Sequence, residues 1–226
     1  MDQSRSVLGT KIRIVHRFRS LRRRLKVDPA VGLVQAYLRL NSFFTVTEYP
    51  VVWQGKSGVR TLTDIDVLAL RLPDAQHWVG STSQQGEALD CDPILNVDPP
   101  SIQMIIGEVK EGKARLNPGA TSQRVIESVI RRFGCCDENP AKVARTVMEK
   151  GSADTRLGSH PCRIRIVVFG GRGTHDSRGF QLIELSHVVQ HVIECARRHS
   201  EVMRASPIKD DALGLMALLV KLDVRI

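Results

Sequence analysis

The chain has 226 residues, of which 42% are hydrophobic and 25% are charged. These proportions exclude a disordered or fibrous chain, and the length is enough for one α/β domain with its own hydrophobic core. No apolar run approaches the roughly 20 residues of a membrane-spanning helix, and the N-terminal region lacks the apolar core of a secretory signal. We therefore expect a soluble protein of the cytoplasm.

The formal net charge of +9 favours a polyanionic partner, because basic residues attract phosphates and release their counterions on binding. Much of the excess lies between Met1 and Val27, where the only acid is Asp2 and the basic residues are Arg5, Lys11, Arg13, Arg17, Arg19, Arg22, Arg23, Arg24 and Lys26. We expect a nucleic acid as the partner, DNA rather than RNA. An anionic membrane surface is the alternative.

Apolar residues recur at helical spacing among these arginines, at Ile14, Phe18, Leu21 and Leu25. The pattern predicts a basic amphipathic helix within residues 1–27. Such a helix would lie on DNA, with Arg22 and Arg23 against phosphates, or pack on the rest of the protein through Phe18 and Leu21. A targeting sequence for an organelle is the third interpretation.

The five cysteines include no CxxC pair, which favours reduced thiols in a cytosolic compartment. Cys135, Cys136, Cys162 and His160 are the only combination that suggests a zinc site, and none of the usual ligand spacings is present. Free cysteines, buried or partly exposed, are the interpretation that we prefer.

Asp28 and Pro29 predict the start of a helix, since Asp accepts hydrogen bonds from the free N–H groups of a first turn and Pro fits its first position. This helix should end near Asn41. Apolar and β-branched runs then predict three strands, over 43–53, 61–72 and 102–110. The segment 73–100 is either a functional loop or carries small elements of its own.

The remaining sequence predicts helices with one further strand. The expected elements are helices over 122–133 and 140–150, a strand over 163–169, and helices over about 185–204 and 208–222. This order predicts an α/β protein, a three-layer α/β/α sandwich with a mixed central sheet. Residues 28–180 would form the core domain, and residues 181–226 a C-terminal helical extension packed on it.

Charged residues lie on the core-facing side of two of these strands. Side chains repeat every second residue along a strand, so Glu108 and Lys110 share a face with Ile102, Met104 and Ile106. By the same rule, Asp64 and Asp66 share a face with Leu68, Leu70 and Leu72.

A carboxylate in a core-facing position is costly unless it is paired or bound to a metal. Carboxylates from two neighbouring strands suit Mg²⁺ or Mn²⁺, which prefer oxygen ligands. The alternative is an ordinary ion pair between Glu108 and Lys110 at a strand end, with Asp64 and Asp66 capping a turn.

The arrangement of an Asp on one strand and Glu-x-Lys at the end of the next resembles the PD-(D/E)xK restriction-endonuclease-like nuclease superfamily. Here the motif is Asp66 in TDIDVLAL and Glu108-Val109-Lys110 in IIGEVKEGK. The order of elements from Asp28 to about Gly171 is also similar to the core of that superfamily. The resemblance implies that fold, and metal-dependent hydrolysis of phosphodiester bonds in DNA.

The resemblance also implies roles for single residues. Asp66, Glu108 and the backbone carbonyl of Val109 would hold one or two Mg²⁺ or Mn²⁺ ions, which polarise the phosphate and acidify a bound water. Lys110 would orient or help to deprotonate this water and neutralise charge that develops on phosphorus.

Several branches of the superfamily carry a further metal-contacting Glu on the first helix. The stretch from Pro29 to Asn41 contains no acid, and Gln35 is its only similar residue. Glu48 on the first strand is a candidate replacement, and Asp64 a candidate additional ligand.

Residues after the motif are candidates for contact with nucleic acid. Lys113 and Arg115 follow the motif directly, and Gln123 and Arg124 begin the next predicted helix, which related nucleases hold near the substrate. A basic, solvated face is the alternative for each of them. For the whole protein, the alternative to a nuclease is a nucleic-acid-binding or protein-interaction module of the same fold with a degraded site. A homodimer, or a subunit of a larger complex, is the expected assembly.

Overall fold

The structure is a computed structural model, and it describes residues 28–55, 58–75, 77–79, 87–89, 91–113, 116–117, 119, 121–134, 136–171, 179–200 and 210–224. The predicted basic helix with Arg22 and Arg23 lies outside the described residues, and so do Arg115 and the side chain of Lys113. The roles expected of these residues stay predictions.

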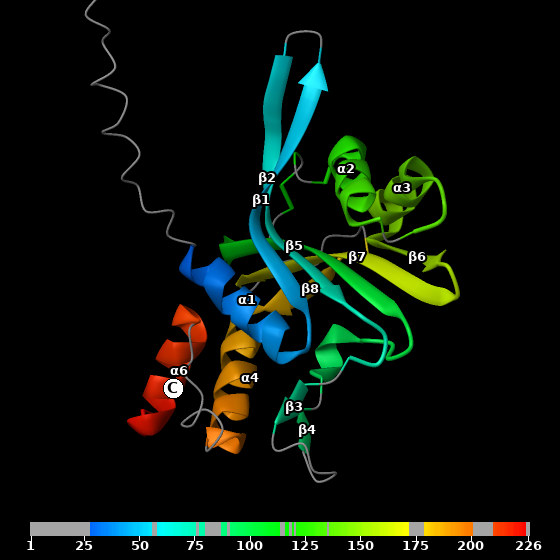
Figure 1. Ribbon diagram of the computed structural model, residues 1–226. Coiled ribbons are helices and arrows are strands. Elements are labelled where there is room, and N and C mark those ends of the chain that lie inside the picture. Colours follow the sequence, from blue (N-terminus) through cyan, green and yellow to red (C-terminus); the bar gives the residue numbers. More distant parts are fainter. Residues whose placement is uncertain are drawn as a thin grey trace, which may run out of the picture.

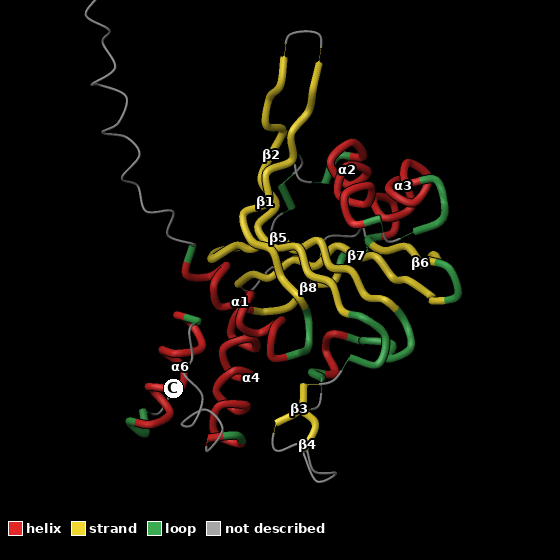
Figure 2. Tube along the Cα trace, in the orientation of Figure 1, coloured by secondary structure: helices red, strands yellow, loops and turns green. Residues whose placement is uncertain are grey.

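A mixed six-stranded sheet forms the centre of the protein (Figures 1 and 2). The strand order is β1-β2-β5-β7-β6, and β8 also pairs with β7. β5 and β8 run parallel to β7, and the other pairs are antiparallel. The strands are β1 (Phe44–Gly55), β2 (Gly58–Arg71), β5 (Ile102–Lys113), β6 (Ser152–Leu157), β7 (His160–Gly171) and β8 (Gln181–Glu184).

Helices pack against both faces of this sheet, each through its own hydrophobic cluster. On one face, α2 (Gln123–Phe133) and α3 (Pro140–Lys150) pack on side chains such as Leu68 and Met104. On the other face, α1 (Pro29–Leu40) and α4 (Leu185–Arg198) pack on side chains such as Ile105 and Phe169, and α6 (Asp211–Lys221) packs against α1 and α4. The α/β class and the mixed sheet are therefore confirmed. β8 and α4 share this sheet and its core with the preceding strands.

The local signals at the start of the first helix operate as expected. Asp28 accepts a hydrogen bond from the N–H of Ala30 at 2.9 Å, Pro29 is the first helical residue, and Asn41 follows the last. The segment 73–100 carries small elements: β3 (His77–Val79) and β4 (Glu87–Leu89), which pair with each other, and the short 3₁₀ helix η1 (Pro93–Leu95).

Strand β6 was not predicted, because its six residues bury only Ala153 and Thr155 and give little apolar alternation. β1 and β2 are longer than expected. They pair with each other as far as Gly55 and Gly58, whereas β2 pairs with β5 only from Val67 onward. The two strands therefore continue beyond the sheet as a projecting hairpin (Figure 1). Within the described part of the chain, no helix combines the length and the apolar character needed to cross a membrane.

Candidate active site

The pairing of β2 with β5 places the two motif carboxylates side by side. Val67 lies opposite Gly107, and Leu68 opposite Ile106. Asp66 and Glu108 are the next residue of each strand, so the register brings them opposite each other. Along β5 the alternation of side chains places Glu108 on the face of Ile106, which α2 and α3 cover. Glu108 is only 4% exposed, whereas Asp66 is partly exposed.

Lys110 bridges these two carboxylates. Its Nζ lies 2.6 Å from Oε1 of Glu108 and 3.8 Å from Oδ2 of Asp66. Burial raises the pKa of Glu108, and the charge of Asp66 adds to this effect, although the hydrogen bond from Lys110 opposes it. Burial alone would lower the pKa of Lys110, but its carboxylate partners raise it above the ordinary value. The ammonium therefore stays charged at neutral pH, beside both carboxylates.

The backbone of β5 also holds Asp66. The N–H of Val109 donates a hydrogen bond of 2.7 Å to Oδ2 of Asp66. Gly107, which pairs with Val67 in this ladder, has little room for a side chain. A Cβ at this position would lie 3.2 Å from the carbonyl oxygen of Val67 and 3.4 Å from the ring of Phe169.

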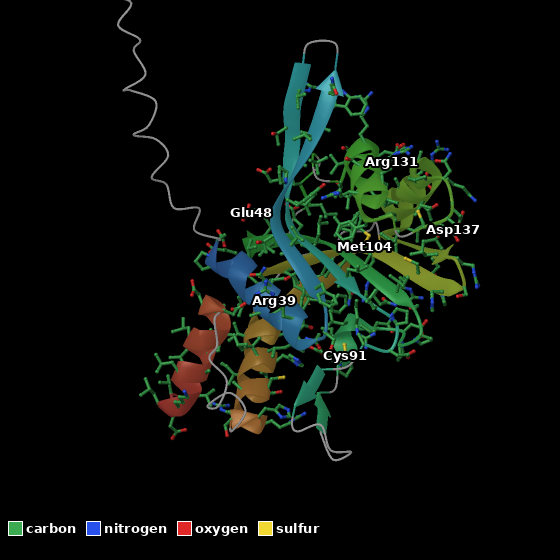
Figure 3. All side chains as sticks on the ribbon, viewed as in Figure 1. Arg39, Glu48, Cys91, Met104, Arg131 and Asp137 are labelled. Carbon is green, nitrogen blue, oxygen red and sulfur yellow. The ribbon has the colours of Figure 1, made fainter. Side chains whose placement is uncertain are left out.

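Glu48 joins the motif residues from β1. The pairs Thr47–Val67 and Tyr49–Ile65 bracket Glu48 and Asp66, so these two residues occupy facing positions. Glu48 has a φ of 51°, a left-handed conformation that is uncommon for a residue with a side chain. Figure 3 labels Glu48 on β1 where the hairpin leaves the body of the protein.

The charge environment of Glu48 shows that several acids gather here. Its pKa is raised by burial and then by the negative charges of Asp66, Asp64 and Asp28. Asp28 also raises the pKa of Lys110. The first helix thus contributes one negative charge that acts on these residues, that of Asp28, for which the sequence predicts only a capping role. Gln35 lies seven residues further along α1, an axial rise of about 10 Å.

Three of the residues predicted to contact nucleic acid, Arg124, Gln123 and Lys113, lie within the described part of the chain, at least by their backbone. The guanidinium of Arg124 lies 5.2 Å from the ring centroid of Trp53 on β1. The side-chain amide of Gln123 donates to the carbonyl of Ala141 at 3.4 Å, which links α2 to α3. The backbone of Lys113 ends β5 opposite Gly171.

The donor set fits a hard divalent cation in its chemistry. Asp66 and Glu108 supply carboxylate oxygens, and the single positive charge of Lys110 already lies between them. As the described side chains stand, no three His, Cys, Asp or Glu residues surround a common point. This also means that the described members of the suggested zinc site form no such group, and Cys162 is buried in the core.

A second polar cluster lies on the side of the sheet that α1 and α4 cover. No sequence motif predicts it. The carboxylate of buried Asp92 accepts a hydrogen bond from the hydroxyl of Tyr37 at 2.8 Å and lies 2.7 Å from Nε2 of His187 and 3.3 Å from Nδ1 of His191. Burial opposes ionisation of Asp92, but the hydrogen bonds from His187 and Tyr37 outweigh it and lower the pKa of this carboxyl. The cluster joins α1, the segment before η1, and α4, and we assign it a structural role.

Comparison of the chain with models of protein families, with curated proteins and with solved structures finds no match. The function of the site is therefore inferred from its residues and their geometry.

Proposed function

We propose that the protein is a nuclease of the restriction-endonuclease-like type, which hydrolyses phosphodiester bonds in DNA with the help of Mg²⁺ or Mn²⁺. One observation carries the proposal. Residues 43 positions apart in the chain meet at one sheet position, where Lys110 lies within 3.8 Å of carboxylates from two neighbouring strands. The net charge of +9 supports a polyanionic substrate.

Each of the motif residues has a separate proposed role. Asp66 and Glu108, with the backbone carbonyl of Val109, would hold the metal, which when bound polarises the scissile phosphate and acidifies water. The N–H of Val109 keeps the carboxylate of Asp66 in a fixed orientation. Lys110 orients the attacking water and stabilises negative charge that develops on the phosphate.

Acids near the motif are candidates to replace the metal-contacting Glu that other branches of the superfamily carry on the first helix. The negative charges of Asp66, Asp64 and Asp28 all act on Glu48. We propose that Glu48 takes the place of the first-helix Glu of other branches, because it faces Asp66 directly across the β1–β2 pair. Asp28 and Asp64 strengthen the attraction for cations at longer range.

The second candidate function is a binding module with an inert site. The observation that favours it is the ion pair of 2.6 Å between Lys110 and Glu108, which occupies a metal-ligating oxygen in the structure. In this case the positively charged surface would hold nucleic acid, or a partner protein, without cleavage.

A cleavage assay separates the two functions. The full chain is incubated with plasmid, linear and branched DNA, and with RNA, in Mg²⁺, in Mn²⁺ and in EDTA. The same assay includes Glu108→Ala, Asp66→Ala and the control Glu138→Ala, which removes an exposed acid whose carboxylate pairs with Lys142 on α3. We expect metal-dependent cleavage of DNA by the wild type and the control, and none by the two site variants. Binding without cleavage in any metal would replace the nuclease with the binding module.

A further inference from the structure

The hairpin that projects beyond the sheet is defined here as the arm, residues Val52–Gly55 and Gly58–Thr61 (Figures 1 and 2). An isolated two-stranded hairpin is at best marginally stable in water. The arm nevertheless exposes large apolar side chains near its end: Val52 is 55% exposed, Trp53 42% and Val59 68%. Exposed apolar residues on a projecting ribbon indicate a surface that a partner covers.

The charge of the arm identifies the kind of partner. The sequence from Pro50 to Thr63 contains no acid and includes Lys56 and Arg60. Arg60 lies directly across from Trp53 in the β1–β2 pair, so both side chains share a face. The guanidinium of Arg124 from α2 lies against the Trp53 ring on this face. Two cations and one aromatic ring therefore form a single patch, which suits phosphates and bases.

The position of the arm ties this patch to the candidate active site. The pair Pro50–Asp64 lies at the base of the arm, and Glu48 and Asp66 follow on the same two strands. A nucleic acid with a phosphate at Lys110 therefore lies beside the arm. The dimensions also agree, because two strands about 4.8 Å apart with their side chains fit a major groove about 12 Å wide.

We propose that the arm enters a groove of double-stranded DNA beside the scissile bond, with Arg60, Arg124 and Trp53 as its main contacts. The proposal rests on the nuclease function for the position of the duplex. Arg60 is six residues from Asp66 along β2, which is about 20 Å of strand and hence roughly six base pairs at 3.4 Å each. Cleavage should therefore require about six base pairs of duplex on one side of the cut bond.

The test measures binding in EDTA, so that it does not depend on cleavage. Arg60→Glu and Arg60→Ala are compared with Arg156→Glu, which makes the same charge change as Arg60→Glu at an exposed position on the edge strand β6. We expect Arg60→Glu to weaken binding of a 20-base-pair duplex at least tenfold, and Arg60→Ala to lower the slope of log affinity against log salt by about one. Arg156→Glu should change affinity less than threefold. Equal melting temperatures show that the arm variants remain folded.

Three results would overturn the proposal. Equal losses of affinity in Arg60→Glu and Arg156→Glu would mean that the arm has no special part in binding. If single-stranded DNA binds as tightly as duplex DNA, with the same dependence on Arg60, the arm does not enter a groove. It would instead be a surface on which bases stack. A change of sedimentation coefficient in Val59→Ser, with unchanged DNA binding by the Arg60 variants, would make the arm a contact between two copies of the chain. If the wild type binds duplex DNA through Arg60 but never cleaves it, the proposal that the arm binds DNA stands, and only the proposed nuclease activity is rejected.

Discussion

The carboxylate of Asp66 accepts its hydrogen bond from the backbone N–H of Val109, the residue between Glu108 and Lys110. One contact thus fixes the orientation of the Asp relative to the strand that carries the other two motif residues. Any shift of β2 against β5 would break this hydrogen bond and would also move the carboxylate of Asp66 away from that of Glu108. The geometry of the site is therefore as rigid as the pairing of the two central strands.

Replacement of Lys110 by Ala should separate catalysis from binding. The change removes the charge that would act on the attacking water and the transition state, and it leaves both carboxylates in place. We expect the cleavage rate at saturating metal to fall by about 10²- to 10³-fold, with DNA affinity changed much less. Single-turnover cleavage and fluorescence anisotropy measure the two quantities. An unchanged rate would remove Lys110 from the mechanism.

Replacement of Glu48 by Gln tests the acid that faces Asp66. The variant keeps the size of the side chain and removes the negative charge that lies opposite Asp66. We expect the Mg²⁺ concentration for half-maximal cleavage to rise by about tenfold or more, as is typical when a group that supports a metal ligand is lost. Glu138→Gln on the exposed surface serves as the control. The same metal dependence in both variants would show that Glu48 has no part in the site.

Replacement of Gly107 by Ala should destabilise the protein through the central strands. The added Cβ would meet the carbonyl oxygen of Val67 at 3.2 Å and its Cβ at 3.3 Å, so Val67 has to shift by a few tenths of an ångström. We expect the free energy of unfolding to fall by about 1–3 kcal/mol. Gly112→Ala, on the same strand, is the matched control, because no heavy atom lies within 4 Å of its Cβ position. Equal denaturation midpoints for the two variants would contradict the close packing at Gly107.

Replacement of Asp92 by Asn should change how stability depends on pH. The folded state lowers the pKa of this carboxyl below its ordinary value of 3.8. Its ionised form therefore stabilises the fold above that pH, and this stabilisation is lost as the pH falls through the lower folded pKa. Asp92→Asn should cost about 1–3 kcal/mol at pH 7 and should lose less stability than the wild type on acidification. Denaturation at pH 7 and pH 3 gives both quantities, with exposed Asp154→Asn as control. Parallel pH curves would show that Asp92 does not stay ionised in the fold.

Removal of residues 1–27 tests the basic segment. If its arginines bind phosphates, the truncated chain should bind DNA more weakly, and its salt slope should fall by about one unit per lost contact. The double variant Arg22→Ala, Arg23→Ala should then account for about two of these units. Binding measured between low and physiological salt decides the matter. An unchanged slope would return the segment to a structural or targeting role.

The parts of the site that could be predicted depend on local periodicity. Alternation along a strand is enough to place Glu108 and Lys110 on one face, and the Asp28-Pro29 pair is enough to start α1. The adjacency of the two motif strands needed one further assumption, that consecutive strands pair, and β2 and β5 do so although β3 and β4 lie between them in the chain.

The parts that could not be predicted depend on tertiary placement. Glu48 lies opposite Asp66 because of the register of β1, and no sequence pattern indicates its left-handed backbone. Asp28 acts on Lys110 only because α1 begins beside the end of β5. Asp92 and His187 are 95 residues apart, and each has an ordinary sequence context.

The unusual conformation of Glu48 has a consequence for the outer edge of the sheet. β1 is the first strand of the sheet order, and a long edge strand invites association with the edge of another molecule. Glu48 leaves the extended conformation in the middle of this strand, and Pro50, two residues later, has no N–H to donate. An added strand would find no continuous ladder to join. The backbone kink at Glu48, opposite Asp66, therefore also interrupts the edge that another strand would join.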